Sequence, residues 1–310
     1  MRRWAVVLSA VSISLGAATT VAGTANAGND NDPYTLSGGN AQAGPMGGVV
    51  PAKGARPGGP KQSPNLTWHG QRVQTSTSSV QPIFWGGSWT SGSEVVQGLY
   101  GFYDHVGGSP YMGTNSEYTT DGTTTGAHVS TGVTRIKRDV IDTSAAPSRA
   151  PSTTTVLNEV VKTIGADNLL GGAYYPVYID QPRGHAGYCA WHSYGTVATT
   201  TGSVQIQFGF FFNLNNDPGC DVDVLYGHSV NLAALGNVSG HELSEMATDP
   251  TLGAWLDSQG AENADKCAWT FSGQPVLLGS ESWQIQGNWS NATYNNHKSG
   301  YANGGCIDGN

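Results

Sequence analysis

The sequence predicts an α+β fold: one domain with a mixed sheet, a helix that carries the candidate site and a loop-rich C-terminal part. Short apolar runs that are typical of strands occur along the chain together with longer segments in which apolar residues recur at helical spacing. The last part of the chain is rich in Trp and Gly, which favours loops. About 240 residues follow the N-terminal segments described next, which is enough for one sizeable core.

The N-terminus has the three parts of a secretory signal peptide. Arg2 and Arg3 precede an apolar stretch over residues 4–15, and small residues follow at Ala25-Asn26-Ala27. We expect cleavage after Ala27, a signal peptide over residues 1–27 and a secreted, extracellular product. No later apolar run approaches the roughly 20 residues that a membrane-spanning helix needs, so we expect no membrane partner.

Residues 28–64 differ in composition from the rest of the chain. They contain many Gly, Pro, Asn and Ala residues and few large apolar side chains, so they cannot bury enough surface to fold by themselves. From Leu66 onward, aromatic and β-branched residues become frequent. We therefore predict a disordered Gly/Pro-rich tail over residues 28–64 and a single folded domain over residues 65–310.

Two elements are predicted in the first part of this domain. Residues 80–85 have the composition of a buried strand, closed by Gly86 and Gly87. Residues 94–106 carry apolar side chains at helical spacing and follow that strand as a helix. Residues 114–134 are rich in Thr, Ser and Gly, fit short strands or loops, and are left unassigned.

The next elements alternate in type. Ser152 and Gly165 bound a second helix, as a serine suited to an N-cap and a glycine suited to a helix C-terminus. Residues 174–179 and 204–212 then have the composition of strands. A third helix is predicted over residues 230–247, and the residue pair Asp-Pro at 249–250 ends it because a residue that precedes proline disfavours the helical conformation.

The third helix carries an HExxE pattern at residues 241–245. On a helix, His241 and Glu245 lie one turn apart on the same face, with Cβ atoms roughly 5–6 Å apart, so that an imidazole and a carboxylate can bind one cation. Glu242 points about 100° away around the helix, as does the base that activates a water in HExxH metalloproteases. The second histidine of that motif is replaced by glutamate here. An ordinary polar helix face is the alternative interpretation.

Two further acids, Glu262 and Asp265, follow the helix. A catalytic zinc usually keeps three protein ligands and one open position. His241, Glu245 and Glu262 would supply three ligands, with Asp265 holding the second ring nitrogen of His241; the reverse assignment of the two acids stays open. Two carboxylates and one imidazole also admit Mn²⁺, Fe²⁺ or Ca²⁺, so zinc is preferred only by analogy.

The domain has four cysteines and no CxxC pair. In an oxidising compartment, an even number of widely spaced cysteines predicts disulfides rather than a thiolate metal site. Three pairings are open. The sequential one, Cys189 with Cys220 and Cys267 with Cys306, is favoured because it closes short loops.

Composition and the remaining motifs limit the other functions. The formal net charge of −8 becomes −10 when the signal peptide and its two arginines are removed, which argues against nucleic acid as a partner. No G-x-S-x-G elbow of a serine hydrolase is present. His192 is either a structurally hydrogen-bonded histidine, the commoner case, or a residue of the same cleft as the HExxE helix. Six tryptophans are candidates for a sugar-stacking surface or for the core: Trp85, Trp89, Trp255, Trp269, Trp283 and Trp289.

Four segments of the domain carry a resemblance to a known family. They are residues 83–86 (Ile-Phe-Trp-Gly), 188–193 (Tyr-Cys-Ala-Trp-His-Ser), 240–250 (Gly-His-Glu-Leu-Ser-Glu-Met-Ala-Thr-Asp-Pro) and 255–267, where Trp-Leu-Asp precedes Glu-Asn-Ala-Asp-Lys-Cys. Together they resemble secreted Exordium-like proteins, also called the phosphate-induced protein family, and their bacterial relatives. The similarity extends from about Val80 to Cys306. It implies a secreted single domain with a site helix like that of zinc-dependent peptidases, but no defined activity.

One residue departs from the family pattern. Around the later acids the family has Glu-Ile-x-Asp-x-Cys, and this chain has Asn263 in place of the apolar residue. Both acids are kept, so the departure concerns the packing of the loop.

Two functions follow from these observations. The first is a secreted metal-dependent hydrolase, a zinc metallopeptidase-like protein acting on an extracellular peptide or protein. The second is a non-catalytic extracellular protein that binds cell-wall glycans and keeps a structural metal.

Overall fold

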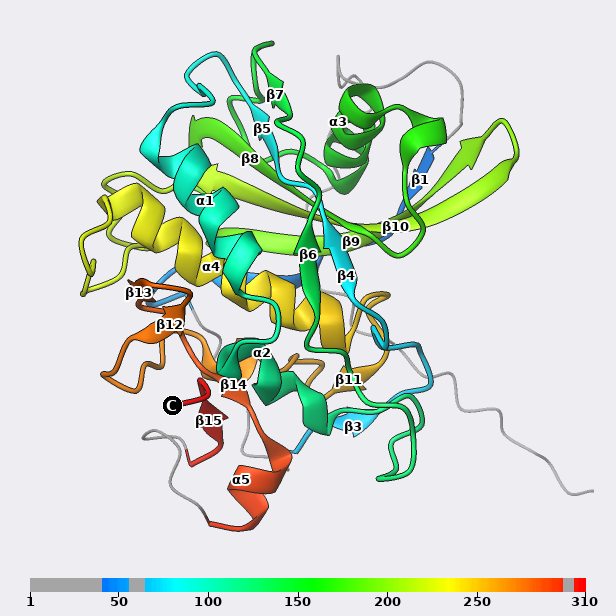
Figure 1. Cartoon of the computed structure of the whole chain (residues 1–310), viewed down its shortest axis with the longest axis vertical. Helices are drawn as coiled ribbons and strands as arrows, with labels where there is room; N and C mark the ends of the chain where they lie inside the picture. Colours follow the sequence, from blue (N-terminus) through cyan, green and yellow to red (C-terminus); the bar gives the residue numbers. More distant parts are fainter. Residues whose placement is uncertain (1–40, 56–64, 298–303) are drawn as a thin grey trace, which may run out of the picture.

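The computed structural model describes residues 41–55, 65–297 and 304–310. In these residues a mixed sheet packs against helices, which confirms the predicted α+β class (Figure 1). The predicted signal peptide, residues 1–27, lies outside the described residues. None of the helices in the described ranges is long and apolar enough to cross a membrane.

A nine-stranded sheet forms the centre of the described fold. Its main path is β1-β9-β10-β8-β4-β6, with β2 paired to β9, and β5 paired to β8 and β7. The β8–β10, β4–β6 and β5–β7 pairs are parallel, and β9 pairs antiparallel with β10, β1 and β2. Its strands are β1 (Ala41–Ala43), β2 (Gly47–Pro51), β4 (Ser78–Val80), β5 (Ile83–Trp85), β6 (Val133–Arg135), β7 (Ile141–Asp142), β8 (Tyr174–Pro182), β9 (Tyr188–Thr199) and β10 (Gly202–Asn213).

Helices and short two-stranded sheets complete the described part of the chain. The helices are α1 (Glu94–His105), α2 (Pro110–Gly113), α3 (Thr153–Ile164), α4 (Val230–Thr248) and α5 (Asn291–Asn295), with 3-10 turns η1 (Thr114–Glu117), η2 (Ala166–Asn168) and η3 (Asp265–Cys267). The small sheets pair β3 (Thr67–Trp68) with β11 (Trp255–Leu256), β12 (Val276–Leu278) with β13 (Glu281–Trp283), and β14 (Asn288–Trp289) with β15 (Cys306–Ile307).

The helices cover opposite faces of the sheet. On β9, His192 points to the face covered by α4, and its ring lies 3.8 Å from Glu245 of that helix. Gly195, at the opposite parity along the strand, approaches Leu157 of α3. Figure 1 shows α1 beside α4, and the two helices are in contact. The sheet is therefore buried on both faces, which agrees with the apolar runs of β5, β8 and β10.

One predicted element needs correction, and the sequence leaves two further segments without a prediction. The strand predicted over residues 80–85 is divided into β4 and β5 at Gln81 and Pro82, since proline has no N–H for a ladder hydrogen bond. The unassigned residues 114–134 form η1, an isolated bridge between Thr119 and His128, and the start of β6. The sequence does not predict strand β9, which lies between β10 and the edge strands β1 and β2.

Part of the predicted disordered tail is ordered. Residues 41–43 and 47–51 form β1 and β2, which extend the sheet beyond β9. Val50 is fully buried in this position. The prediction for residues 28–64 is therefore wrong over residues 41–55, because the apolar surface that orders this segment belongs to the domain and not to the segment itself.

Two disulfides join the C-terminal half. They link Cys189 with Cys220 and Cys267 with Cys306, which confirms the favoured sequential pairing. Disulfides are typical of proteins that fold in oxidising compartments. The second bridge ties η3 to β15, and the first ties the start of β9 to the loop after β10.

Candidate metal centre

Helix α4 passes through the interior of the domain. Every residue from Asn231 to Thr248 is buried, and the helix begins at Ser229, whose Oγ accepts a hydrogen bond from the N–H of Leu232. Asp249, the residue after the helix, accepts hydrogen bonds from the backbone N–H groups of Gly253 and Ala254. The polar side chains of the HExxE pattern therefore have to find partners inside the protein.

The first group of donors consists of His241, Glu245 and Asp265. The Nε2 atom of His241 lies 3.0 Å from Oε1 of Glu245 and 3.6 Å from Oδ1 of Asp265. One ligand atom from each residue falls within 4.8 Å of the other two, a spacing that can hold a metal ion. The backbone N–H of Asp265 donates to Oε1 of Glu245 at 2.8 Å, so η3 is fixed against the site helix.

A second group shares Glu245 with the first. His192, Glu242 and Glu245 also bring one ligand atom each within 4.8 Å of one another. The Nε2 atom of His192 lies 2.9 Å from Oε2 of Glu262 and 3.8 Å from Oε2 of Glu245. The structure thus brings all five predicted site residues and His192 into one cluster, which is buried except for the partly exposed Asp265, and it places Asp265 rather than Glu262 beside His241.

Two positioning residues were not found from the sequence. The side-chain amide of Gln286 contacts Nδ1 of His241, which leaves Nε2 directed at Glu245 and Asp265. The backbone N–H of Gln286 in turn donates to the side chain of Asn237, one turn before His241 on α4. Gln286 lies in a loop far along the chain from the helix, and no motif marks it.

Several polar atoms of the cluster have no ordinary hydrogen bond. Both carboxylate oxygens of Glu242, Oε2 of Glu245 and Nε2 of His241 are buried in this state. Buried polar atoms without partners are costly and uncommon in folded proteins. Among the contacts of the described residues, no Lys or Arg forms an ion pair with any of the four carboxylates of the cluster. A cation would satisfy both the unpartnered atoms and the charge, so the residues present fit a metal.

The pKa values of the cluster reflect burial and mutual repulsion. Burial raises the pKa of Glu242 well above its ordinary value, and the charges of Glu245 and Asp265 raise it further; only the backbone of Val50 opposes this. Burial also raises the pKa of Glu262, and Glu245 adds to the effect. Excess negative charge in a buried space is the condition that a bound cation relieves.

The two histidines respond in opposite directions. Burial, together with the nearby charge of His241, lowers the pKa of His192 to about 3. Burial would also lower the pKa of His241, but the charge of Glu245 and the contact with Asp265 outweigh it and raise this pKa to about 9. Of the two histidines, His241 is therefore the one that the neighbouring carboxylates stabilise in its charged form.

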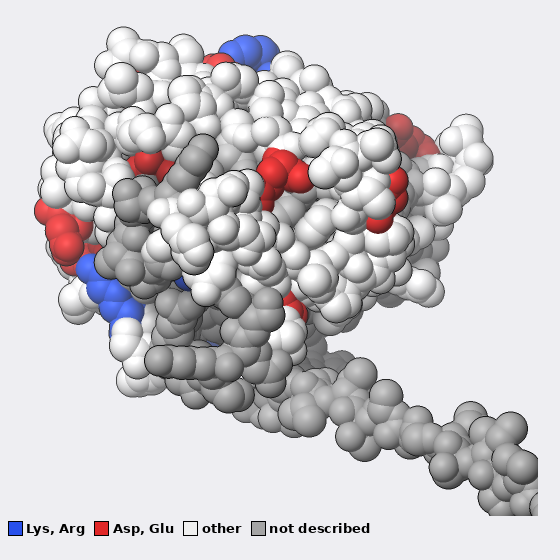
Figure 2. Space-filling model, turned by 90° about the horizontal axis from the view of Figure 1, so that it is seen from below, with Lys and Arg blue, Asp and Glu red and all other residues white. Residues whose placement is uncertain are grey.

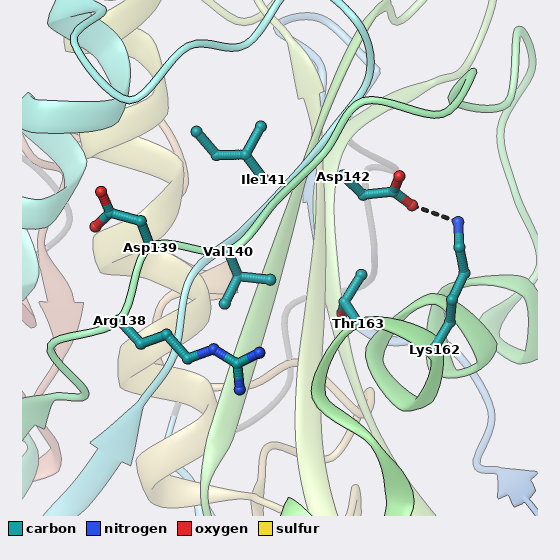
Figure 3. Close-up of a pocket in the computed structure, with 7 residues that line it drawn as sticks. All are labelled: Arg138, Asp139, Val140, Ile141, Asp142, Lys162 and Thr163. Atoms are coloured by element: carbon teal, nitrogen blue, oxygen red, sulfur yellow. Dashed lines mark hydrogen bonds and ion pairs between the residues drawn. The ribbon is translucent and has the colours of Figure 1, made fainter.

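The surface of the protein offers a separate hollow. A pocket of about 320 Å³ is lined by residues 138–142 with Lys162 and Thr163, and none of the cluster residues contributes to it. Figure 3 shows that Lys162 reaches across this pocket to Asp142. The charged groups that could hold a ligand there are thus partly paired with each other, and the buried cluster on α4 is the stronger candidate site.

Surface features do not favour the other predicted functions. Five of the six tryptophans considered for sugar stacking are buried: Trp85, Trp89, Trp255, Trp283 and Trp289. On the face seen in Figure 2, Asp and Glu side chains are scattered among uncharged ones, and Lys and Arg are sparse among the described residues. The tryptophans therefore belong to the core and do not form the exposed aromatic face that glycan stacking needs.

Comparison with known proteins adds no relative to these observations. No family model matches the chain, and no curated protein and no solved structure is similar to it. The function has to be inferred from the geometry of the cluster.

Proposed function

We propose that this chain is a secreted, metal-dependent hydrolase of the zincin type, with a peptide as its substrate. His241, Glu245 and Asp265 hold the cation, and Glu242 is the general base. The observation that carries the proposal is the group of three donors within 4.8 Å of one another, inside a cluster of buried and unpartnered carboxylate oxygens. Zinc is the first choice by analogy with other HExx(H/E) helices, and Mn²⁺, Fe²⁺ and Ca²⁺ suit the same donors.

The group with Asp265 is preferred over the group with His192 for two reasons. It leaves Glu242 free for chemistry, whereas the other group uses Glu242 as a ligand. It also uses the histidine whose ring is fixed from behind by Gln286. In this assignment His192 and Glu262 are not ligands. Nε2 of His192 and Oε2 of Glu262 lie 2.9 Å apart as a hydrogen-bonded pair, and this pair orients Glu245 from the side away from His241.

The residues divide the work of hydrolysis between them. When bound, a cation here would polarise the scissile carbonyl and raise the acidity of a water. Glu242 takes a proton from the water whose oxygen forms the new bond to the carbonyl carbon. It returns that proton to the leaving nitrogen as the C–N bond breaks, giving an amine and a carboxylic acid, and the acid then loses the second proton of the water to the amine or to solvent.

The Glu242→Gln change tests this assignment. It removes a base and keeps every proposed ligand, so the metal content should stay unchanged while turnover falls by roughly 10²–10⁴. Hydrolysis of a quenched fluorescent peptide mixture per mole of bound metal gives the turnover, and elemental analysis gives the metal content. Glu159→Gln is the matched control, because Glu159 is a buried glutamate of α3 outside the cluster. Equal turnover of Glu242→Gln and the control would refute the role of Glu242.

The glycan-binding alternative has a test of its own. It predicts that the full mature chain is retained on insoluble cell-wall polysaccharide, and that Glu242→Gln does not change this retention. Because the candidate tryptophans lie in the core, we expect no retention above that of an unrelated acidic protein.

A further inference from the structure

A segment near the N-terminus of the described chain covers the His192 and Glu245 side of the candidate metal centre. His192, His241, Glu242 and Glu245 have no exposed surface. Strand β2 lies over them, with Gly47 opposite His192 in the antiparallel pairing with β9. A Cβ atom at Gly48 would overlap both the His192 ring and the Glu245 carboxylate. The backbone of the segment therefore rests directly on two residues of the cluster.

Residues 44–51 thus form a strap across the cluster. Hydrogen bonds to its backbone hold both ends, and Val50 is fully buried near its C-terminal end. The N–H of Gly44 donates to the carbonyl of Tyr194 at 2.7 Å, and the carbonyl of Pro45 accepts from Oγ of Ser193 at 2.6 Å. At the other end, Nε1 of Trp269 donates to the carbonyl of Pro51 at 2.8 Å.

The strap lies where an extended peptide would bind. Strand β9 is an inner strand only because β1 and β2 lie beside it, as Figure 1 shows for β1. Without them, β9 would be an edge strand next to the metal donors, with free backbone groups for an added strand. The pairing of β2 is irregular between Gly47 and Val50, so the strap leaves the regular ladder at the residues that face the cluster.

We propose that the strap is an intramolecular substrate mimic: it occupies the β9 edge on which an extended peptide, with a small residue over the metal donors, binds antiparallel to the strand. The identity of this edge as a substrate site rests on the proposed function. The two disulfides join residues 189 to 220 and 267 to 306, so neither ties the strap to the domain. The chain is latent while the strap is seated and open when it leaves.

Two glycines give a matched pair of variants in the full mature chain. Gly48 and Gly54 both have positive φ, +48° and +80°, so alanine strains the backbone at either position. A Cβ at Gly48 overlaps His192 and Glu245, whereas a Cβ at Gly54 meets nothing within 4 Å. Gly48→Ala should therefore unseat the strap, and Gly54→Ala should show the effect of strain alone.

A labelled peptide with the sequence of residues 41–55 is added to each protein, and fluorescence anisotropy measures its binding. The Gly48→Ala protein should bind this peptide roughly tenfold or more tightly than the wild type and Gly54→Ala, in which the strap competes. A peptide with valine in place of Gly48 should bind none of them. Equal binding to both variants, or equal binding of the two peptides, would overturn the proposal.

A second form of the experiment does not depend on the folding of Gly48→Ala. A recognition sequence for a specific protease, inserted between Gly59 and Pro60 of the full chain, lets the strap be cut from the domain after folding. The cut protein should exchange its strap for the labelled peptide, and the uncut protein should not; a cut protein that takes up no peptide would contradict the proposal. Neither form needs a metal or turnover, so a chain without metal would refute the proposed function and leave the peptide test valid.

Discussion

Burial determines the chemistry of the single residues at the centre of this protein. Glu242, Glu245 and Glu262 would be ordinary surface acids if α4 were an exposed helix, and their carboxylates would be solvated. In the fold all three are buried, and burial raises the pKa of each; the charge of Glu245 raises the pKa of Glu242 and of Glu262 further. The proposal of a metal centre follows from this accumulated charge and from the donor spacing together.

A buried carboxyl outside the cluster gives a pH-dependent prediction. Burial, and the hydrogen bond to Asp142, raise the pKa of Glu159 from 4.5 to about 8. Between these values the folded state holds a proton that the unfolded state has lost, so the free energy of unfolding falls as pH rises through this window. Glu159→Gln keeps a neutral side chain and should remove this fall.

Urea unfolding at several pH values checks the prediction for Glu159. The wild type and Glu159→Gln should differ little near pH 4.5, and the variant should gain relative stability up to about pH 8. A constant difference between the two proteins over this range would show that Glu159 titrates normally in the fold.

The sequence predicts part of the site at this scale, and the reason lies in local geometry. His241 and Glu245 are neighbours because they are one helical turn apart, so a helix prediction already places them together. His192 lies in the same cluster because of the register of β9, and Gln286 because of the path of a distant loop. Neither can be predicted from a local sequence pattern. The choice between Glu262 and Asp265 depends on the turn at η3, and spacing alone left it open.

At the scale of elements, α4 contains two glycines that allow close packing. A Cβ atom at Gly236 would overlap the ring of Trp283, and one at Gly240 would approach Ile285 and Tyr111. Glycine in a helix interior normally lowers stability by roughly 0.5–1 kcal/mol relative to alanine. In α4 the two glycines leave room for the segment around β13, which packs directly against the helix backbone.

Gly236→Ala and Gly101→Ala should therefore have opposite effects. At Gly101 of α1, the nearest atom to an added Cβ is Oε2 of Glu281 at 3.8 Å, an ordinary contact. We expect Gly101→Ala to raise the free energy of unfolding by roughly 0.5–1 kcal/mol. Gly236→Ala should lower it by roughly 1–3 kcal/mol through overpacking. Chemical denaturation measures both, and a gain at Gly236 would contradict the close packing.

The elements differ in how far the sequence predicts them. The helices over 94–106, 153–164 and 230–247 were predicted almost to their ends, because helical spacing and capping residues are local signals. Strand β9 was missed because its aromatic, polar and glycine residues follow no simple alternation. Strands β1 and β2 could not be predicted, since their own composition resembles a linker and their order comes from pairing with β9.

At the scale of the whole molecule, the two disulfides hold different parts of the site. Their sequence separations are 31 and 39 residues, so each should contribute a similar stabilisation, roughly 4 kcal/mol. Only the Cys267–Cys306 bridge ends in η3, which begins with Asp265. Cys189 lies on β9, which hydrogen bonds fix on both sides.

Paired Cys→Ser variants separate stability from metal binding. Loss of either bridge should lower the free energy of unfolding by a similar amount, while loss of Cys267–Cys306 should also weaken metal affinity by roughly 10–100-fold, as for a residue that supports a ligand. Denaturation and competition with a chromogenic chelator give the two quantities. An equal loss of metal affinity in both variants would show that the position of Asp265 does not depend on the Cys267–Cys306 disulfide.

Whether the buried cluster binds a metal can be decided from the metal content of the mature protein. Elemental analysis would compare the wild type, the His241→Ala, Glu245→Ala double variant, and the Glu159→Gln control. We expect about one equivalent of a divalent metal in the wild type and the control, and none in the double variant. His192→Ala should keep the metal with weaker affinity. No metal in the wild type, or a full equivalent in the double variant, would contradict the claim that this buried cluster is a metal centre.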